Sequence, residues 1–207
     1  MNHPSVIVFD LGNVLIPFDY SIIIKKFNEI DNGLGDRFLK LYKENYHVHR
    51  DYEKSAITTE EFLTIMMEWT EHKIEKEDFC KYFSNIFIEN KELTAILPSL
   101  KKYYKLILLS NTNYIHRKYG WGNYSFLNYF DKLILSYEVK AIKPEEKIYR
   151  TVESYTQLPS SEHLFIDDVL DYVEGAKKCG WDGIQFQNNR QLITELNKRN
   201  IILNGIN

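Results

Sequence analysis

The chain contains few cysteines and no excess of positive charge, and these shortages exclude several classes of protein. Only two of the 207 residues are cysteines, Cys80 and Cys179, and they lack the close spacing of a metal-binding motif. Both fall in apolar patterns, which favours small buried thiols in a reducing compartment. The formal net charge of -3 argues against a nucleic-acid partner and against a membrane surface, because both would favour a basic patch.

Long apolar runs, internal repeats and low-complexity segments are also missing. No stretch has the basic start, apolar centre and small-residue cleavage site of a signal peptide, and no run approaches the ~20 apolar residues of a membrane span. Hydrophobic residues make up 44% and charged residues 27%, as in ordinary soluble globular proteins. We therefore expect a cytoplasmic protein, either a monomer or a homodimer, with one large domain or a core domain that carries a smaller inserted one.

Short apolar runs that end in a polar residue predict the strands. The first run, Val6-Ile7-Val8-Phe9, leads directly into Asp10 and is typical of a strand buried on both faces. Similar runs occupy residues 105–109, 132–136, 163–166 and 183–186. Helical patterns alternate with them at residues 91–103, 145–155, 169–179 and 190–199. This alternation predicts a doubly wound parallel sheet with right-handed crossovers.

Between the first two predicted strands the chain changes character. From about Asp19 to Ile88 strand signal is scarce, and apolar residues recur at helical spacing in four groups. Gly33 with Gly35, and then the polar stretch through Thr58, are expected to separate these helices. Thr58 itself is predicted to cap the start of the helix that follows it.

These patterns together predict an α/β protein with two parts. A Rossmann-like core with a doubly wound parallel sheet would comprise residues 1–17 and 89–207. An all-helical cap, residues 18–88, would be inserted directly after the first strand.

Polar residues at the predicted strand ends form a candidate site. Asp10, Ser110 and the pair Asp167 and Asp168 would lie at one edge, because the carboxyl ends of parallel strands meet there. Lys143 opens the helix between the last two of these positions. Converging carboxylates repel one another and need either protons or a cation. Mg²⁺ suits such oxygen ligands, and a hydroxyl and an ammonium would supply donors to a phosphoryl oxygen.

Each of these residues also has a simpler interpretation. Asp167 and Asp168 could serve as N-cap and first-turn acid of the following helix, although one aspartate suffices for a cap. Ser110 could merely end a strand, and Lys143 could be a solvated lysine before Pro144. Their joint occurrence, in order and at strand ends, favours chemistry.

The motifs resemble those of the haloacid dehalogenase-like (HAD) superfamily of hydrolases. In chain order, the matching stretches are Asp10 to Leu15, Ser110-Asn111-Thr112, Lys143-Pro144 with Ile148-Tyr149, and Phe165-Ile166-Asp167-Asp168. The resemblance covers nearly the whole chain, including a cap after the first motif. Further stretches are similar to the sugar-phosphate phosphatases related to glucose-1-phosphate phosphatase and to the phosphatase domain of epoxide hydrolase; they are Leu109 to Asn113 with His116, Asp168 to Ala176, and Tyr52 to Phe62.

This resemblance implies a Mg²⁺-dependent phosphatase for a small phosphorylated metabolite, and we expect a sugar phosphate. Asp10 would attack phosphorus and form an aspartyl phosphate, which splits one hard displacement into two. The metal would be held by the Asp10 carboxylate, the Gly12 backbone carbonyl and Asp168, with Asp167 as a further candidate ligand.

The resemblance also implies the phosphate contacts. Ser110 and the Asn111 amide would bind the phosphoryl oxygens, and Lys143 would add positive charge and pair with Asp167. On the substrate side Glu53 and Lys54 either select sugar hydroxyls or form an ordinary solvated pair.

His116 and Gly12 leave alternatives open. His116 either contacts substrate or is a satisfied histidine. Gly12 stands where most phosphatases of this superfamily have a second aspartate, which protonates the leaving oxygen and typically contributes ~10² to 10⁴ in rate. Either the substrate has an acidic leaving oxygen, as in an anomeric or acyl phosphate, or Asn13, Asp19 or His116 substitutes, or the chain binds phosphate without turnover. We prefer the first account, because the sugar-phosphate phosphatases that the chain resembles share Gly-Asn here.

Two other functions follow from the missing aspartate. A catalytically impaired phosphate-binding protein would keep the fold and the pocket. A haloacid dehalogenase also lacks that aspartate, but it attacks carbon without a metal. The doubled carboxylate of Asp167 and Asp168 therefore favours a metal-dependent phosphatase.

Overall fold

Strand β1 (Val6–Phe9) lies at the centre of a five-stranded parallel sheet. The computed structural model describes residues 4–201; residues 1–3 and 202–207, the two ends of the predicted core, lie outside the described residues. The strand order is β3-β2-β1-β4-β5, and the other strands are β2 (Lys105–Ser110), β3 (Lys132–Leu135), β4 (His163–Asp167) and β5 (Asp182–Gln185). The predicted doubly wound sheet is confirmed.

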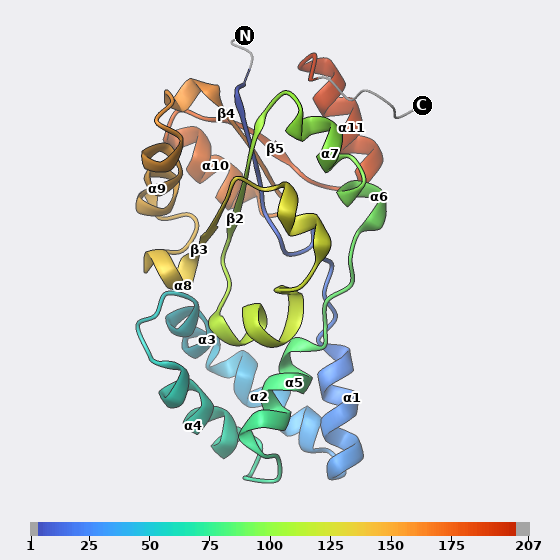
Figure 1. Cartoon of the computed structure of the whole chain (residues 1–207). Coiled ribbons are helices and arrows are strands. Elements are labelled where there is room, and N and C mark those ends of the chain that lie inside the picture. The colour runs from blue at the N-terminus through green and yellow to red at the C-terminus, as the bar shows by residue number, and fades with distance from the viewer. Residues whose placement is uncertain (1–3, 202–207) are drawn as a thin grey trace.

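Successive side chains of β1 feed two separate cores, one on each face of the sheet. Ile7 and Phe9 pack with the helices on one face, whereas Val6 and Val8 pack with those on the other. The first face is covered by α6 (Lys91–Thr94), α7 (Leu97–Lys101), the 3₁₀ helix η2 (Ser125–Tyr129) and α11 (Asn189–Lys198). The second face is covered by α9 (Glu146–Thr156) and α10 (Leu170–Lys178), as Figure 1 shows.

Most predicted boundaries in this part agree with the structure to within one residue. One predicted helix, 91–103, is instead two short helices, α6 and α7, and Pro98 lies in the first turn of α7. Three further short helices are α8 (Ser136–Val139), the π-helix η1 (His116–Trp121) and the 3₁₀ helix η3 (Ser160–Glu162). Cys80 and Cys179 are free thiols and both are buried, as predicted. Within residues 4–201 no helix combines the length and the apolar character needed to cross a membrane.

The first five helices after β1 surround an apolar cluster of their own, below the sheet in Figure 1. They are α1 (Ser21–Ile30), α2 (Leu34–Glu44), α3 (Tyr46–Glu53), α4 (Thr59–Trp69) and α5 (Lys76–Ser84). The predicted N-cap is confirmed, because Thr58 and Glu61 form a capping box at the start of α4. Two expectations were wrong: Gly35 lies inside α2, where an added Cβ would stand 2.2 Å from the Ile24 carbonyl oxygen, and the polar stretch before Thr58 contains helix α3.

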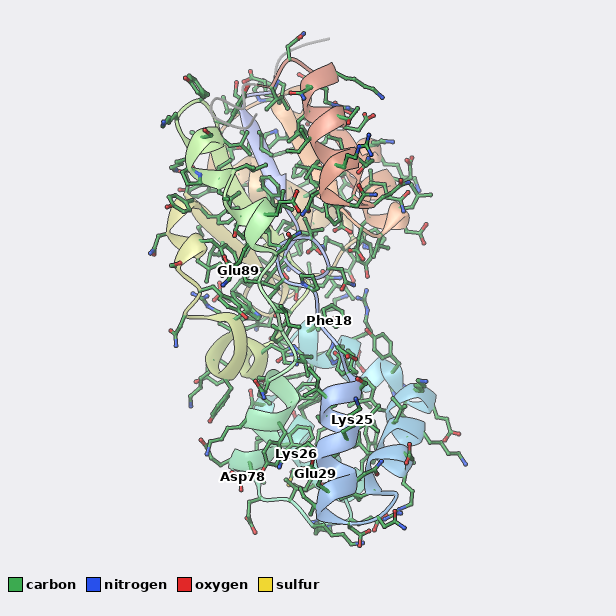
Figure 2. The ribbon with its side chains drawn as sticks, turned by 90° about the vertical axis from the view of Figure 1, so that its right-hand side faces the viewer. Phe18, Lys25, Lys26, Glu29, Asp78 and Glu89 are labelled. Atoms are coloured by element: carbon green, nitrogen blue, oxygen red, sulfur yellow. The ribbon has the colours of Figure 1, made fainter. Side chains whose placement is uncertain are left out.

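The chain passes between the sheet and these helices twice, and the two crossings pair. Phe18 and Phe87 form an antiparallel bridge, and Ile88 N donates to Pro17 O at 2.8 Å. Figure 2 shows Phe18 at the narrow junction between the two parts. The edge of the sheet that carries the carboxyl ends of the strands therefore faces the helices across a short double connection.

Candidate active site

Three aspartates meet at the carboxyl ends of β1 and β4. Asp10 follows β1, and its N–H donates to Ile166 O at 2.8 Å, so the sheet pairing continues through it. Asp167 ends β4 and Asp168 comes next. One carboxylate oxygen from each lies within 4.8 Å of the others, and within residues 4–201 no other group of three His, Cys, Asp or Glu side chains is so close. The sequence prediction that Asp10, Asp167 and Asp168 converge agrees with this geometry.

The ammonium of Lys143 lies between two of these carboxylates. Its Nζ is 2.5 Å from Asp10 Oδ1 and 2.6 Å from Asp167 Oδ2, and all three side chains are buried. Lys143 Nζ also stands 5.1 Å from the centroid of the Tyr172 ring. Burying an unpaired charge costs several kcal/mol, so this lysine and the two aspartates depend on one another. We refer to Asp10, Lys143, Asp167 and Asp168 as the charged centre.

The electrostatics of the charged centre favour a further cation. Burial raises the pKa of the Asp10 carboxyl; the adjacent Lys143 opposes this rise, and repulsion from Asp167 adds to it. Burial also raises the pKa of Asp168, and the charge of Asp167 acts in the same direction. For Lys143 burial favours the neutral amine, but Asp10 and Asp167 outweigh it and raise the pKa of the ammonium. Three carboxylates against one ammonium leave a surplus of negative charge.

The two neighbouring aspartates differ in how many contacts they make. Asp167 Oδ1 accepts from Val169 N at 2.8 Å and its Oδ2 accepts from Lys143, so both oxygens are engaged. Asp168 accepts one side-chain bond, from Asn13 Nδ2 at 3.3 Å. Hard carboxylate oxygens with free lone pairs fit Mg²⁺, and Asp10 and Asp168 offer them. Asp167 is better placed to anchor Lys143 than to bind a metal.

The turn after β1 brings Gly12 and Asn13 to this edge. Leu15 N and Ile16 N both donate to Leu11 O at 2.9 Å, which closes the turn, and Asn13 takes a left-handed φ of 54°. Asparagine tolerates that conformation better than most residues. The turn directs the Asn13 side chain to Asp168.

Asn111 positions Lys143 through its side chain. Its Oδ1 accepts from Lys143 N at 2.8 Å, and its Nδ2 donates to Lys143 O at 3.3 Å. Arg50 of helix α3 donates to the same carbonyl oxygen at 3.1 Å. The side-chain amide of Asn111 thus engages both the N–H and the C=O of Lys143. Ser110, the other predicted phosphate ligand, is buried beside it.

A cavity of about 150 Å³ opens beside the charged centre, and we call it the polar cavity. Gly12, Ser110 and Asn111 border it from the core, and His116 borders it from η1. Its remaining lining comes from both sides of the junction: Leu11, Ile16, Phe18, Tyr20, Tyr46, His49, Glu53, Phe87, Thr112 and Trp121. The predicted substrate residues Glu53 and His116 are both buried here.

The other predicted residues lie elsewhere. Lys54 Nζ is 2.6 Å from Glu145 Oε1, so it links α3 to the start of α9, and it is absent from the lining of the polar cavity. Asp19 accepts from both the backbone N–H and the hydroxyl of Ser21 at 2.8 Å, at the start of α1.

Phe18 occupies the space beside Gly12. A Cβ added to Gly12 would stand 3.2 Å from Phe18 Cε1. The aromatic ring therefore lies where an acidic side chain at position 12 would project. The absence of a side chain at Gly12 leaves room for the ring of Phe18.

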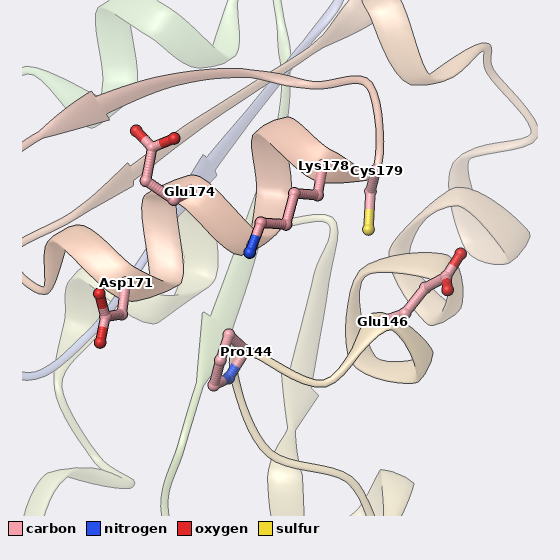
Figure 3. Close-up of a pocket in the computed structure, with 7 residues that line it drawn as sticks. Pro144, Glu146, Asp171, Glu174, Lys178 and Cys179 are labelled. Atoms are coloured by element: carbon pink, nitrogen blue, oxygen red, sulfur yellow. The ribbon is translucent and has the colours of Figure 1, made fainter.

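A larger hollow of about 490 Å³ lies away from the charged centre, between α9 and α10 (Figure 3). Its acidic residues Glu146, Asp171 and Glu174 come from separate turns, and Figure 3 shows Glu146 and Asp171 on opposite sides of Pro144. None of them belongs to the group of close carboxylates. Volume alone does not mark the site.

The structure adds functional candidates that the sequence patterns did not indicate. His49 and Arg50 lie on α3, and Tyr42 on α2 contacts His49. A signal was present: Tyr46, His49 and Glu53 are spaced i, i+3, i+7, which places them on one helix face. That face is polar, so it did not produce an apolar stripe.

Comparisons with known proteins agree with this arrangement. The chain is 27% identical over 210 residues to D-ribitol-5-phosphate phosphatase of Bacteroides thetaiotaomicron, covering 96% of this chain and 98% of that one. It is 25% identical to a phosphorylated carbohydrates phosphatase of Thermotoga maritima, over 87% of this chain and 83% of that one. A HAD-family enzyme of B. thetaiotaomicron, solved as a magnesium complex, superposes with a TM-score of 0.80 at 26% identity, over 93% and 99% of the two chains.

A family model provides the decisive match. The model for haloacid dehalogenase-like hydrolases matches residues 4–180, which include the charged centre, the helices α1 to α5 and four of the five strands. The protein belongs to the haloacid dehalogenase-like hydrolase family.

Proposed function

We propose that this hydrolase is a Mg²⁺-dependent phosphatase that removes phosphate from a small phosphorylated carbohydrate or polyol. The observation that carries the proposal is the charged centre, whose three carboxylates converge beside Lys143. Gly12, Ser110 and Asn111, which lie next to it at the strand ends, line the polar cavity. In this proposal residues 18–88 act as a cap domain over a core of residues 1–17 and 89–207. The similarity to two phosphatases of phosphorylated carbohydrates and polyols supports the substrate class.

Asp10 is the proposed nucleophile. Lys143 holds Oδ1 of this carboxylate, so we assign in-line attack on phosphorus to Oδ2. The O–P bond to Asp10 forms as the bond to the leaving oxygen breaks, which gives an aspartyl phosphate. Water then attacks phosphorus, the bond from phosphorus to Asp10 breaks, and inorganic phosphate and the free carboxylate are released.

Asp10, the backbone carbonyl of Gly12 and Asp168 would hold Mg²⁺, with Asp167 fixing Lys143 beside them. The bound metal supplies positive charge that neutralises the transferring phosphoryl group. Ser110 and the Asn111 backbone N–H would donate to the phosphoryl oxygens, and Asn13 would keep the Asp168 carboxylate in place. Lys143 contributes the remaining positive charge.

Gly12 sets the limit of this chemistry. Without an acid at this position, protonation of the leaving oxygen has no side chain from the first motif, and Phe18 fills the space. Phosphate compounds with acidic leaving oxygens, such as acetyl phosphate or anomeric sugar phosphates, should therefore turn over faster than alkyl phosphates. The alternative is a protein that binds phosphate compounds but hydrolyses them at a negligible rate.

The test is phosphate release from acetyl phosphate and from a panel of sugar and polyol phosphates, with Mg²⁺ and with a chelator. We expect Mg²⁺-dependent turnover that Asp10→Asn lowers by at least ~10³, because the nucleophile is removed while its shape is kept. Asp171→Asn, an exposed acid on α10, is the matched control and should stay within about twofold of the wild type.

Two outcomes would contradict the proposal. Equal activity in wild type and Asp10→Asn would indicate another nucleophile or a contaminant. No turnover in either, combined with thermal protection by Mg²⁺ and fluoroberyllate, a phosphoryl mimic, would favour the phosphate-binding protein.

A further inference from the structure

His116 borders the polar cavity and carries an unpaired, fully buried polar atom. Its side chain is buried, and within residues 4–201 its Nε2 is the one fully buried side-chain nitrogen or oxygen without a hydrogen-bond partner. The ring stacks on Phe83 with centroids 4.4 Å apart and meets Phe87 edge-on at 5.1 Å. Leaving such a group unsatisfied costs roughly 1–3 kcal/mol, so a hydrogen-bond acceptor that reaches it from the adjoining cavity would be favoured.

The hydrogen bonds around His116 determine which nitrogen carries the proton. Asn113 Oδ1 accepts from His116 N at 2.9 Å, so the other end of the Asn113 amide is its NH₂ group. That NH₂ group lies 3.3 Å from His116 Nδ1 and donates to it. Nδ1 is therefore the acceptor and Nε2 carries the hydrogen. Burial, and then the charge of His49, hold the pKa of His116 well below its usual value, which keeps the ring neutral.

Glu53 supplies the complementary acceptor. Tyr42 Oη lies 2.7 Å from His49 Nδ1, and His49 Nε2 lies 3.2 Å from Glu53 Oε1. Because a carboxylate can only accept, His49 donates to Glu53, and its other nitrogen pairs with the Tyr42 hydroxyl. Arg50 Nη1 stands 3.4 Å from the second oxygen, Oε2. Each Glu53 oxygen keeps a lone pair for a ligand.

The donor and the acceptor border one cavity. The rings of His49 and His116 have centroids 6.2 Å apart, and His49, Glu53 and His116 all line the polar cavity. A hydroxyl group both accepts and donates, so it satisfies the His116 N–H and the Glu53 carboxylate together. No lysine or arginine is among the lining residues, and the nearby Arg50 already pairs with Glu53. A second anionic group on the substrate would therefore meet the Glu53 carboxylate without a cation of its own.

On the basis of the proposed function, we propose that His116 and Glu53 select substrates by hydroxyl groups on the leaving alcohol. The substrate would be the phosphate monoester of a short, neutral polyhydroxy compound. A cavity of about 150 Å³ matches one that holds benzene in another protein, which limits the enclosed part of the substrate to about six heavy atoms. A three-carbon chain with its oxygens has this size.

Three phosphate esters of equal chain length test the selection without any substitution. Glycerol 3-phosphate carries two hydroxyls, n-propyl phosphate carries none, and 3-phosphoglycerate replaces the terminal hydroxymethyl group by a carboxylate. We expect kcat/KM for glycerol 3-phosphate to exceed that for n-propyl phosphate by about 10- to 100-fold, and 3-phosphoglycerate to be the poorest substrate. Equal values for the first two esters, or a preference for 3-phosphoglycerate, would overturn the proposal.

His116→Phe tests the residue itself, because phenylalanine keeps the stack on Phe83 and removes the donor. We expect the preference for glycerol 3-phosphate over n-propyl phosphate to shrink at least fivefold, and Glu53→Gln to reduce the penalty on 3-phosphoglycerate. His47→Phe, an exposed histidine on α3, is the matched control and should keep the wild-type ratios. An unchanged ratio in a folded His116→Phe variant would rule out this role.

A binding measurement separates this inference from the proposed phosphatase activity. Calorimetry of the same three esters on Asp10→Asn with Mg²⁺ gives dissociation constants that do not require turnover. We expect glycerol 3-phosphate to bind most tightly, n-propyl phosphate less tightly and 3-phosphoglycerate most weakly. If wild type hydrolyses none of the compounds, including acetyl phosphate, while Asp10→Asn still prefers glycerol 3-phosphate, the proposed activity fails and the hydroxyl selection holds. If the wild type hydrolyses the esters but neither assay shows a preference for glycerol 3-phosphate, the proposed activity holds and the hydroxyl selection fails.

Discussion

The charged centre and the polar cavity adjoin one another, but different interactions hold their side chains in place. In the charged centre, ion pairs of 2.5 and 2.6 Å join Lys143 to Asp10 and Asp167. In the polar cavity, a neutral hydrogen bond from Asn113 fixes the His116 ring, and His49 and Arg50 hold the Glu53 carboxylate at the longer distances of 3.2 and 3.4 Å. Charges act on any phosphate, whereas a directed neutral donor discriminates between leaving groups. The two proposals therefore assign reaction and selectivity to separable sets of residues.

Lys143→Met gives the largest expected effect on this division. Methionine keeps the length and removes the charge, which leaves Asp10 and Asp167 as buried carboxylates without their cation. Loss of one partner of such a pair destabilises the fold by about 3–5 kcal/mol, and we expect turnover to fall by at least ~10². Urea unfolding and phosphate release measure the two losses.

The control for this variant is Lys147→Met, which removes an exposed lysine from the first turn of α9, four residues further along the chain. Its unfolding free energy should change by less than about 0.5 kcal/mol. Added Mg²⁺ should recover part of the stability of Lys143→Met, because it binds the folded carboxylates. A variant as stable as the wild type without Mg²⁺ would mean that the charged centre does not depend on its lysine.

Gly12→Asp is expected to have an intermediate effect, because it introduces an acid between the two regions. The new Cβ would stand 3.2 Å from Phe18 Cε1, so the single variant should lose about 1–3 kcal/mol of stability through overpacking. Phe18→Leu in the same chain should relieve most of this loss. Only the double variant should then hydrolyse glycerol 3-phosphate faster than wild type, by at least ~10-fold, because the acid can protonate a poor leaving group.

Phe18→Leu alone is the control for this pair, and it should not accelerate hydrolysis. The gain in the double variant should be smaller with acetyl phosphate, whose leaving oxygen needs little protonation. A folded double variant with unchanged rates on both esters would contradict the explanation given for Gly12.

The charged centre could be predicted from the sequence because its residues follow contiguous signals. Each of β1, β2 and β4 is an apolar run that stops at a polar residue, so Asp10, Ser110 and Asp167 are marked by position alone. Parallel strands then bring these ends to one edge. The sheet and the convergence of the three aspartates follow from this logic.

The polar cavity could not be predicted in the same way. The family resemblance points to two of its residues, Glu53 and His116, but the helix that carries Glu53 has little apolar periodicity. Helix α3 directs Tyr46, His49 and Glu53 at a polar cavity, so the stretch resembles a loop in its composition. The orphaned Nε2 of His116 depends on the packing of η1 against α5, which no local pattern records. The contacts of Asn111 with Lys143, 32 residues away in sequence, likewise have no local signal. The pairing of Lys143 with Asp167, in contrast, is implied by the resemblance and is present in the structure.

Lys54 gives the smallest expected effect and tests the boundary of the polar cavity. The sequence leaves open whether Lys54 contacts substrate or forms an ordinary solvated pair. The structure pairs Lys54 with Glu145 at 2.6 Å, with both side chains more than a third exposed. Exposed pairs of this kind contribute about 0.2–1 kcal/mol, so a double-mutant cycle of Lys54→Met and Glu145→Gln should give a coupling energy in that range by urea unfolding. The preference for glycerol 3-phosphate over n-propyl phosphate should change by less than about threefold, because Lys54 does not line the cavity. A tenfold loss of that preference in Lys54→Met alone would place Lys54 among the residues that select the substrate, and the polar cavity would then extend to the contact between α3 and α9.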